Sequence, residues 1–187
     1  RTKENKRGDI WNYLLQNTYK PYFLKNYFDI VLGFPPWLTY KYIKATSYQS
    51  ELRELVIKYH LTPEKKADMI LVELASILLS HASVYFLKEK GNLAFIMPRI
   101  LFNADHHDII RSGSARGYKI DEIWDLQNVI PLFYVPACVI FATKHAEKAG
   151  IPKQGIQGKI FSGIFHSIEG TWEQMKYMME CKEGKWY

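Results

Sequence analysis

Residues 28–40, FDIVLGFPPWLTY, decide the fold. The first six residues, FDIVLG, are β-branched or apolar and end in a glycine, which is typical of a short buried strand. Two prolines and a tryptophan follow almost at once. Proline fixes φ and carries no N–H donor, so residues 34–37 form a stiff loop whose carbonyls can accept hydrogen bonds. Ligands of open α/β sheets bind beyond the carboxyl ends of strands, so this loop is the first candidate for a binding site.

Strand and helix patterns alternate along the rest of the chain. Helices are predicted over residues 8–26 with a break at Pro21, 47–60, 66–89 as one long helix, 104–112 and 171–182, and strands over 28–33, 91–98, 119–127, 137–144 and 159–165. This alternation predicts an α/β protein with a parallel sheet. Residues 128–136 are too few for a helical crossover, so the strand at 137–144 is expected to run antiparallel to its neighbour.

Composition limits the class of protein. The 187 residues are 48% hydrophobic and 15% aromatic, which suits a folded domain with a sizeable core and excludes a disordered chain. The net charge of +6 suits a polyanionic partner such as nucleic acid, although an ordinary basic domain is the simpler reading of the charge alone.

The sequence carries no targeting or membrane signal. Residues 1–9 are charged and lack an apolar core, so they are not a signal peptide. The apolar stretch 67–86 contains Asp68, Glu73 and His81, which favours a buried helix over a membrane span. We therefore expect a cytoplasmic protein with no membrane contact.

Cysteine and histidine provide no metal-ligand pattern. Cys138 and Cys181 belong to no CxxC pair, so both are expected to be reduced thiols. His106 and His107 are adjacent, and adjacent side chains on a helix point about 100° apart. A solvated helix start is therefore favoured over metal ligation, and no metal site is predicted.

Three segments of this sequence together resemble the amino-group (N6-adenine) DNA methyltransferases, most closely the large restriction–modification and phage-defence enzymes. The family's catalytic motif, Asn, Asp or Ser followed by Pro-Pro and an aromatic residue after a strand, resembles residues 28–40. Residues 67–98 resemble the helix and strand that follow, and residues 120–144 resemble the closing strand pair. The likeness covers roughly residues 24–144 and implies the C-terminal portion of a Rossmann-like sheet, parallel with a final antiparallel strand.

The resemblance implies a chemistry for the loop. In the family, two oxygen acceptors polarise the adenine amino group towards the methyl of S-adenosylmethionine after the base has been flipped out of the duplex. Carried over by position, the Pro35 carbonyl is one acceptor, Pro36 stiffens the loop and Trp37 stacks on the base. Phe34 stands at the catalytic position of the second acceptor, where it cannot accept a hydrogen bond. Transfer by this chain is therefore expected to be slow.

Three further residues are candidates at the same site. Asp68 is a candidate contact to the cofactor, although a helix N-terminal charge is the simpler reading. Tyr40 follows the motif and is a candidate for lining the base pocket, with core packing equally plausible. Arg99 follows a strand end and is a candidate substrate contact, to DNA phosphate, with ordinary surface charge as the alternative.

The cofactor loop of the family is not found in this sequence. The family binds S-adenosylmethionine with a glycine-rich loop upstream of the Pro-Pro motif, and none of the 33 residues before Phe34 resembles it. We therefore expect a piece of a longer enzyme, with an N-terminal helical segment (1–27), a catalytic portion (28–144) and a linker, strand and short helix (145–187). The expected partners are DNA and a restriction or specificity domain or subunit. Two alternatives remain: a non-catalytic DNA-binding or scaffolding remnant, and a protein glutamine methyltransferase.

Overall fold

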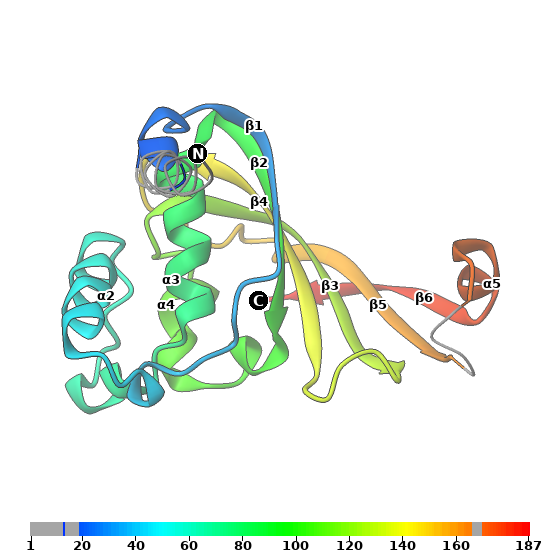
Figure 1. Ribbon diagram of the computed structural model, residues 1–187. Coiled ribbons are helices and arrows are strands. Elements are labelled where there is room, and N and C mark those ends of the chain that lie inside the picture. The colour runs from blue at the N-terminus through cyan, green and yellow to red at the C-terminus, as the bar shows by residue number, and fades with distance from the viewer. Residues whose placement is uncertain (1–12, 14–18, 166–169) are drawn as a thin grey trace, which may run out of the picture.

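The computed structural model describes residues 13, 19–165 and 170–187, and these residues form one six-stranded sheet (Figure 1). The strands are β1 (Phe28–Gly33), β2 (Leu87–Pro98), β3 (Gly117–Ile130), β4 (Ala137–His145), β5 (Ile156–Ile164) and β6 (Met179–Trp186). Their order across the sheet is β1-β2-β4-β3-β5-β6. The predicted N-terminal segment lies mostly outside the described residues.

The strand directions confirm the predicted α/β class. β1 pairs with β2, and β3 with β5, in parallel, whereas β4 is antiparallel to both of its neighbours, β2 and β3. The prediction of an antiparallel strand at 137–144 is therefore confirmed. β6 adds a further antiparallel strand beyond β5.

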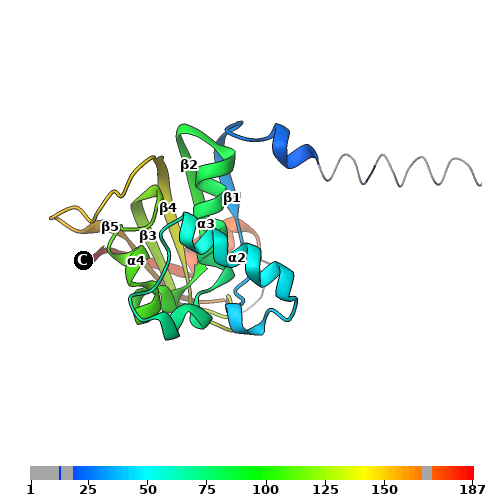
Figure 2. The same cartoon turned by 90° about the vertical axis from the view of Figure 1, so that its left-hand side faces the viewer.

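The main helices cover one side of this sheet. The helical elements that follow β1 are η1 (Tyr40–Tyr42), α2 (Thr46–Lys58), η2 (Lys66–Leu71), α3 (Leu74–His81), the π-helical turn η3 (Ala82–Phe86), η4 (Arg99–Phe102), η5 (Asp105–His107), α4 (Asp108–Arg111) and α5 (Trp172–Tyr177). Figures 1 and 2 show α2, α3 and α4 on the same side, while β5 and β6 carry α5 away from them. None of the helices formed by the described residues has the length and apolar content needed to cross a membrane.

The predicted single helix at 66–89 is wrong, because tertiary contacts interrupt it. The segment divides into η2, α3 and η3, and β2 begins already at Leu87. The backbone N–H groups of Asn26 and Tyr27 donate to the carbonyls of Tyr85 (2.8 Å) and Phe86 (3.0 Å). A longer helix would need those carbonyls for its own next turn, so the chain leaves the helix where β1 begins.

The end of this helix is also held by a buried cation. Lys144 on β4, whose side chain is only 8% exposed, donates to the carbonyl of Leu87 at 2.8 Å and to Oδ1 of Asn26 at 2.8 Å. Its Nζ lies 3.2 Å from a carboxylate oxygen of Glu89. Lys144 thus joins β4 to the junction between η3 and β2.

We expect Lys144→Met to lower the free energy of unfolding by about 2–3 kcal/mol, because the methionine fills the space but leaves buried acceptors without a donor. Urea unfolding measures the change. The control Lys148→Met, at an exposed position, should change stability by no more than about 0.5 kcal/mol. Equal effects of the two substitutions would contradict the role given to Lys144.

Other predicted helices are shorter than expected. The segment 104–112 divides into η5 and α4, and helical residues at 19–23 continue through Pro21. The helix predicted at 171–182 stops at Tyr177, because the following residues pair with β5 as strand β6. The helix predicted at 47–60 is confirmed as α2.

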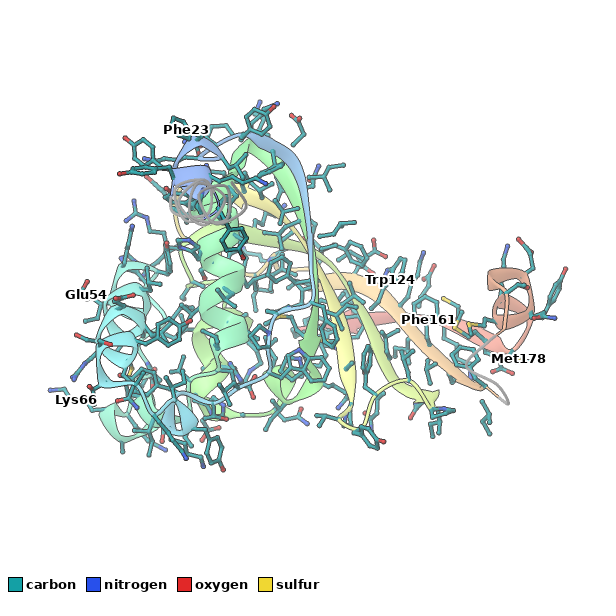
Figure 3. The ribbon with its side chains drawn as sticks, in the orientation of Figure 1. Phe23, Glu54, Lys66, Trp124, Phe161 and Met178 are labelled. Atoms are coloured by element: carbon teal, nitrogen blue, oxygen red, sulfur yellow. The ribbon has the colours of Figure 1, made fainter. Side chains whose placement is uncertain are left out.

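The opposite side of the sheet carries a row of aromatic side chains. Trp124 of β3 contacts Phe141 of β4 and Phe161 of β5, with ring centroids 4.7 and 5.3 Å away, and Figure 3 shows Trp124 and Phe161 turned away from α3. The Lys159 ammonium lies 5.2 Å from the centre of the Trp124 ring. This row ties β4, β3 and β5 together on the face that the helices leave uncovered.

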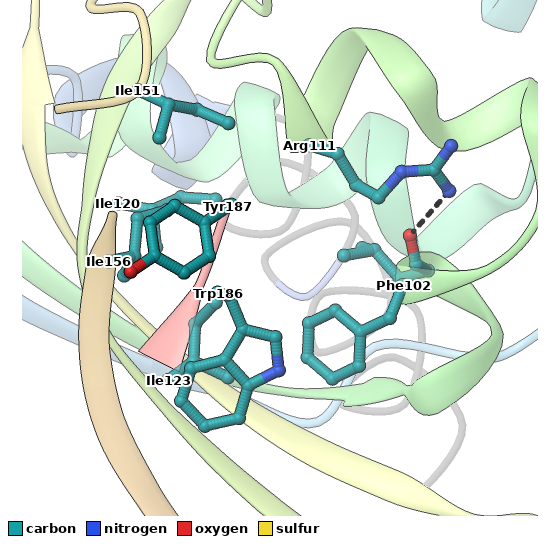
Figure 4. Close-up of a pocket in the computed structure, with 9 residues that line it drawn as sticks. Phe102, Arg111, Ile120, Ile123, Ile151, Ile156, Trp186 and Tyr187 are labelled. Atoms are coloured by element: carbon teal, nitrogen blue, oxygen red, sulfur yellow. Dashed lines mark hydrogen bonds between the residues drawn. The ribbon is translucent and has the colours of Figure 1, made fainter. Parts of the chain in front are cut away.

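A small apolar cavity lies where β6 meets the segment after β2 (Figure 4). Trp186 packs against Phe102 with ring centroids 6.0 Å apart, and Ile120 and Ile123 are among the other residues that line the cavity. Its volume of about 60 Å³ is far below that of pockets which hold a nucleotide-sized ligand. The cavity is therefore a packing seam, and the candidate site lies elsewhere.

Candidate functional site

The proline-rich loop begins at the carboxyl end of β1. Gly33 lies so close to β2 that a Cβ there would approach a ring carbon of Phe95 to 2.5 Å, so no larger residue fits without displacing that ring. After this close approach the chain leaves the sheet, with Pro35 buried and Pro36 exposed. Because β1 and β2 are parallel, the loop lies at the edge of the sheet where β2 also ends.

Three aromatic rings meet at this edge. The ring centroids of Phe34, Trp37 and Phe133 are 5.3 Å (Phe34–Trp37), 5.4 Å (Phe34–Phe133) and 5.5 Å (Trp37–Phe133) apart. We call these three residues the aromatic cluster. Distances of this size mark direct ring contact, so a nucleobase would enter by displacing one of the rings. Phe34 is 59% exposed, and Trp37 is held by a hydrogen bond from its indole N–H to the carbonyl of Ile96 (3.2 Å).

The chain after Trp37 is anchored to the start of α3. The N–H of Leu74 donates to the carbonyl of Leu38 (2.8 Å), and the N–H of Tyr40 donates to the carbonyl of Val72 (2.9 Å). The Tyr40 hydroxyl donates to the backbone carbonyl of Gln49 at 2.8 Å. Tyr40 therefore fixes the loop to α2, and its predicted contact with a base stays a prediction.

A buried acid–histidine pair lies behind this anchor. The Glu73 backbone forms a β-bridge with Thr39, and one of its carboxylate oxygens lies 3.6 Å from Nε2 of His107. The other ring nitrogen of His107 lies 3.4 Å from the Ser76 hydroxyl. Glu73 thus connects the loop after β1 with the segment after β2. The exposed fraction of His107 is 1%, so access of substrate to this pair is excluded in this conformation.

The burial of His107 corrects the prediction of a solvated helix start at residues 105–108. The His106 ring contacts that of His107 in a tilted arrangement, with ring centroids 4.3 Å apart. Burial lowers the pKa of His106, and the neighbouring His107 lowers it further, while Glu73 and Asp68 oppose the change. Within the described ranges, no group of three or more histidine, cysteine or acidic side chains is arranged to hold a metal ion.

Asp68 lies in a different place from the aromatic cluster. It lines a pocket of about 160 Å³ whose other walls are Glu64, Lys65, Asp105 and Asp108. Four carboxylates and one ammonium make this pocket strongly anionic. The predicted contact of Asp68 with a cofactor stays a prediction.

Arg99 is already paired within the protein. Its Nε lies 2.9 Å from both carboxylate oxygens of Asp125, and Asp125 is only 4% exposed. The N–H of Gln127 also donates to this carboxylate at 3.0 Å. A role for Arg99 on DNA phosphate therefore competes with an existing ion pair.

The buried Cys138 lies near the same ion pair. Burial, with the Asp125 charge, raises the pKa of the Cys138 thiol well above its usual range, so this cysteine is unreactive.

The structure unites part of the predicted site and adds one residue. Phe34 and Trp37 meet directly. Tyr40 and Arg99 are engaged in other contacts, and Asp68 lines a separate pocket. Phe133 was missed as a site residue. Its signal in the sequence is the aromatic loop bracketed by Pro131 and Pro136 between two strands.

No protein-family model matches the chain, and no curated protein matches it in sequence. The solved structures that overlap part of the fold at low identity include three complexes with DNA or a DNA mimic. The ATP-dependent Type ISP restriction-modification enzyme LlaBIII bound to DNA matches with 13% identity and a TM-score of 0.48 over 72% of this chain. DrdV in complex with DNA matches with 13% identity and a TM-score of 0.45 over 82%. A nuclease-deletion mutant of the Type ISP restriction-modification enzyme LlaGI with a DNA substrate mimic matches with 10% identity and a TM-score of 0.46 over 72%.

These proteins are much larger. The matched region covers 10% of the LlaBIII chain, 17% of the DrdV chain and 12% of the LlaGI chain.

Proposed function

We propose that this chain supplies the target-base side of a DNA methyltransferase domain that acts on the N6 amino group of adenine, within a restriction–modification system. The observation that carries the proposal is the aromatic cluster built on a Pro-Pro loop at the carboxyl end of β1. An apolar aromatic cluster at this edge of an α/β sheet suits a base that has left its duplex and that displaces one ring on entry.

The loop offers one acceptor for the amino group. No N–H group of the described chain donates to the carbonyl of Pro35. A base that displaces one ring of the aromatic cluster would stack on the rings that remain. A hydrogen bond from the adenine amino group to this carbonyl would orient the nitrogen. Stacking on an aromatic side chain contributes about 1–3 kcal/mol per base.

The second acceptor is missing. Phe34 places a hydrocarbon ring where the proposed chemistry requires a side-chain oxygen. Loss of one preorganised polar group costs about 10²–10³ in rate, so this chain would bind a base better than it activates one.

The described residues do not fit S-adenosylmethionine. The sequence has no glycine-rich strand–loop before β1, and the pocket of Asp68, at about 160 Å³, is smaller than pockets that hold a nucleotide-sized ligand. In the proposal, the methyl donor is therefore held by another segment or subunit, and this chain contributes only the contacts to the base.

A second reading, a DNA-binding remnant that no longer methylates, is favoured by one observation. The three rings of the aromatic cluster already pack against one another, so the cluster is closed without a base. Both readings place DNA at this edge, where Lys41 and Lys44 are exposed on the segment after Trp37. They differ in whether restoring an acceptor restores methyl transfer.

We expect the chain to bind a duplex with a single extra, bulged adenine at least about tenfold more tightly than the fully paired duplex, because the bulged base needs no unpairing. Fluorescence anisotropy with labelled duplexes measures both affinities. Binding to both should weaken steeply as salt rises, since the net charge is +6.

The matched control is a duplex with a bulged abasic nucleotide, which has the same backbone but no base. Affinity for this duplex should equal that for the paired one. Equal affinity for all three duplexes, or binding that is insensitive to salt, would count against a base-binding site on this edge.

A further inference from the structure

The loop between β3 and β4, residues 131–136, presents one aromatic side chain fully to solvent. Tyr134 has a relative exposure of 109%, more than any other described large apolar side chain. Its neighbours Leu132 and Val135 are also exposed, at 41% and 48%. Packing within the described chain therefore does not account for a tyrosine at this position.

The loop is held firmly at both ends. The N–H of Phe165 donates to the carbonyl of Ile130 at 2.7 Å, and the N–H of Arg99 donates to the carbonyl of Pro136 at 2.8 Å. Between these points the loop arches over a pocket of about 310 Å³ lined by its own residues and those at its base. The tip is thus projected from the sheet by two backbone anchors.

Two consecutive residues of this loop point to different places. Phe133 contacts Phe34 and Trp37 in the aromatic cluster, whereas Tyr134 contacts solvent. Consecutive Cα atoms are about 3.8 Å apart, so the two rings extend from neighbouring points of the backbone. One loop therefore contributes one ring to the aromatic cluster and holds a second ring in solvent beside it.

We propose that Tyr134 is a wedge that enters the DNA duplex at the place vacated by the extruded base. This inference rests on the proposed function, since it requires a base in the aromatic cluster. Extruding a paired base leaves a gap in the stack, and an aromatic side chain fills such a gap by stacking between the neighbouring base pairs. A bulged base leaves no gap when it is extruded, because the flanking pairs close on each other.

If Tyr134 is a wedge, its removal should lower the affinity for a paired duplex and leave the affinity for a bulged duplex unchanged. Binding of a duplex with a paired 2-aminopurine requires that this base be extruded. Tyr134→Ala should weaken this binding by about tenfold, which is the size of one lost stacking contact. Binding of a duplex with a bulged 2-aminopurine should change by less than about twofold. Anisotropy gives the affinities, and 2-aminopurine emission reports extrusion.

Two further variants sharpen the test. Tyr134→Phe keeps the ring and should retain the wild-type affinity for the paired duplex. Tyr177→Ala removes a similarly exposed tyrosine, 89% exposed on α5 at the far end of the sheet in Figure 1, and should change neither affinity.

The outcomes separate the wedge from the proposed function. If the wild-type chain prefers the bulged duplex but Tyr134→Ala weakens both duplexes equally or neither, the wedge is overturned and a protein-binding role for the loop is favoured. If the wild-type chain shows no preference for the bulged base, the proposed function fails together with the wedge.

Discussion

Replacing Phe34 with asparagine should raise adenine methylation by about two orders of magnitude or more, when the chain is joined to a half that binds S-adenosylmethionine. Asparagine supplies the missing oxygen acceptor beside the Pro35 carbonyl, and one preorganised group of this kind contributes about 10²–10³ in rate. Because Phe34 is 59% exposed, the new amide stays hydrated and the cost in stability should be only about 1 kcal/mol. Transfer of labelled methyl groups to duplex DNA measures the gain.

Phe34→Ala is the matched control, because it opens the cluster without adding an acceptor. It should give no more than a few-fold change in rate. A gain with Phe34→Ala equal to that with Phe34→Asn would mean that the ring blocks the site. No gain with either variant, together with a folded protein by thermal melting, would favour the remnant reading.

Trp37→Ala should weaken binding of the bulged-adenine duplex by about thirtyfold, because it removes the main stacking surface, worth about 1–3 kcal/mol. The substitution also removes the hydrogen bond to Ile96 that positions the loop. Anisotropy at constant salt measures the loss, and thermal melting of each variant reports its stability.

The control for this prediction is Trp37→Phe, which keeps a ring but has no N–H for the Ile96 carbonyl. It should weaken binding by about threefold only, since the stacking surface remains. A loss as large as that of Trp37→Ala would show that the hydrogen bond, and not the stacking surface, determines affinity.

The sequence predicts the part of this fold that depends on local pattern. Alternating strand and helix signals indicate the α/β class, and the short segment 128–136 indicates the antiparallel direction of β4. The strand β1 and its glycine are predicted from FDIVLG alone, but the expected burial is wrong, because β1 is an edge strand in which Ile30 and Leu32 are 63% and 76% exposed. The reason for that glycine, a close approach to Phe95 on a neighbouring strand, needs the structure.

Long-range pairing explains what local pattern misses. Helical periodicity continues through residues 82–89, but Asn26 and Tyr27, just before β1, donate to the carbonyls that another turn would need, and Lys144 from a distant strand donates to the carbonyl of Leu87 at the end. In the same way, the polar sequence of β6 carries little strand signal, and its pairing with β5 determines its structure. Such competition between segments is invisible in a local window.

In the candidate site, too, the residues of one local motif are predicted from the sequence, whereas those brought in by long-range contacts are not. Phe34 and Trp37 are predicted because they stand together in one motif, whereas Phe133 joins them from about a hundred positions further along the chain. The link between Glu73 and His107 is missed for the same reason. Arg99 is predicted from its place at a strand end, but its ion pair with Asp125 depends on the register of β2, β4 and β3.

The most direct test of the base-binding account is the indole N–H signal of Trp37 in ¹⁵N-tryptophan-labelled protein, followed by NMR during titration with the bulged-adenine duplex. Entry of a base into the aromatic cluster should shift this signal through the ring current of the adenine, while the signals of Trp124 and Trp186, which lie in other packing contacts, stay unchanged. The bulged abasic duplex should leave the Trp37 signal in place. A Trp37 signal that does not move when the adenine-containing duplex is bound would contradict the account.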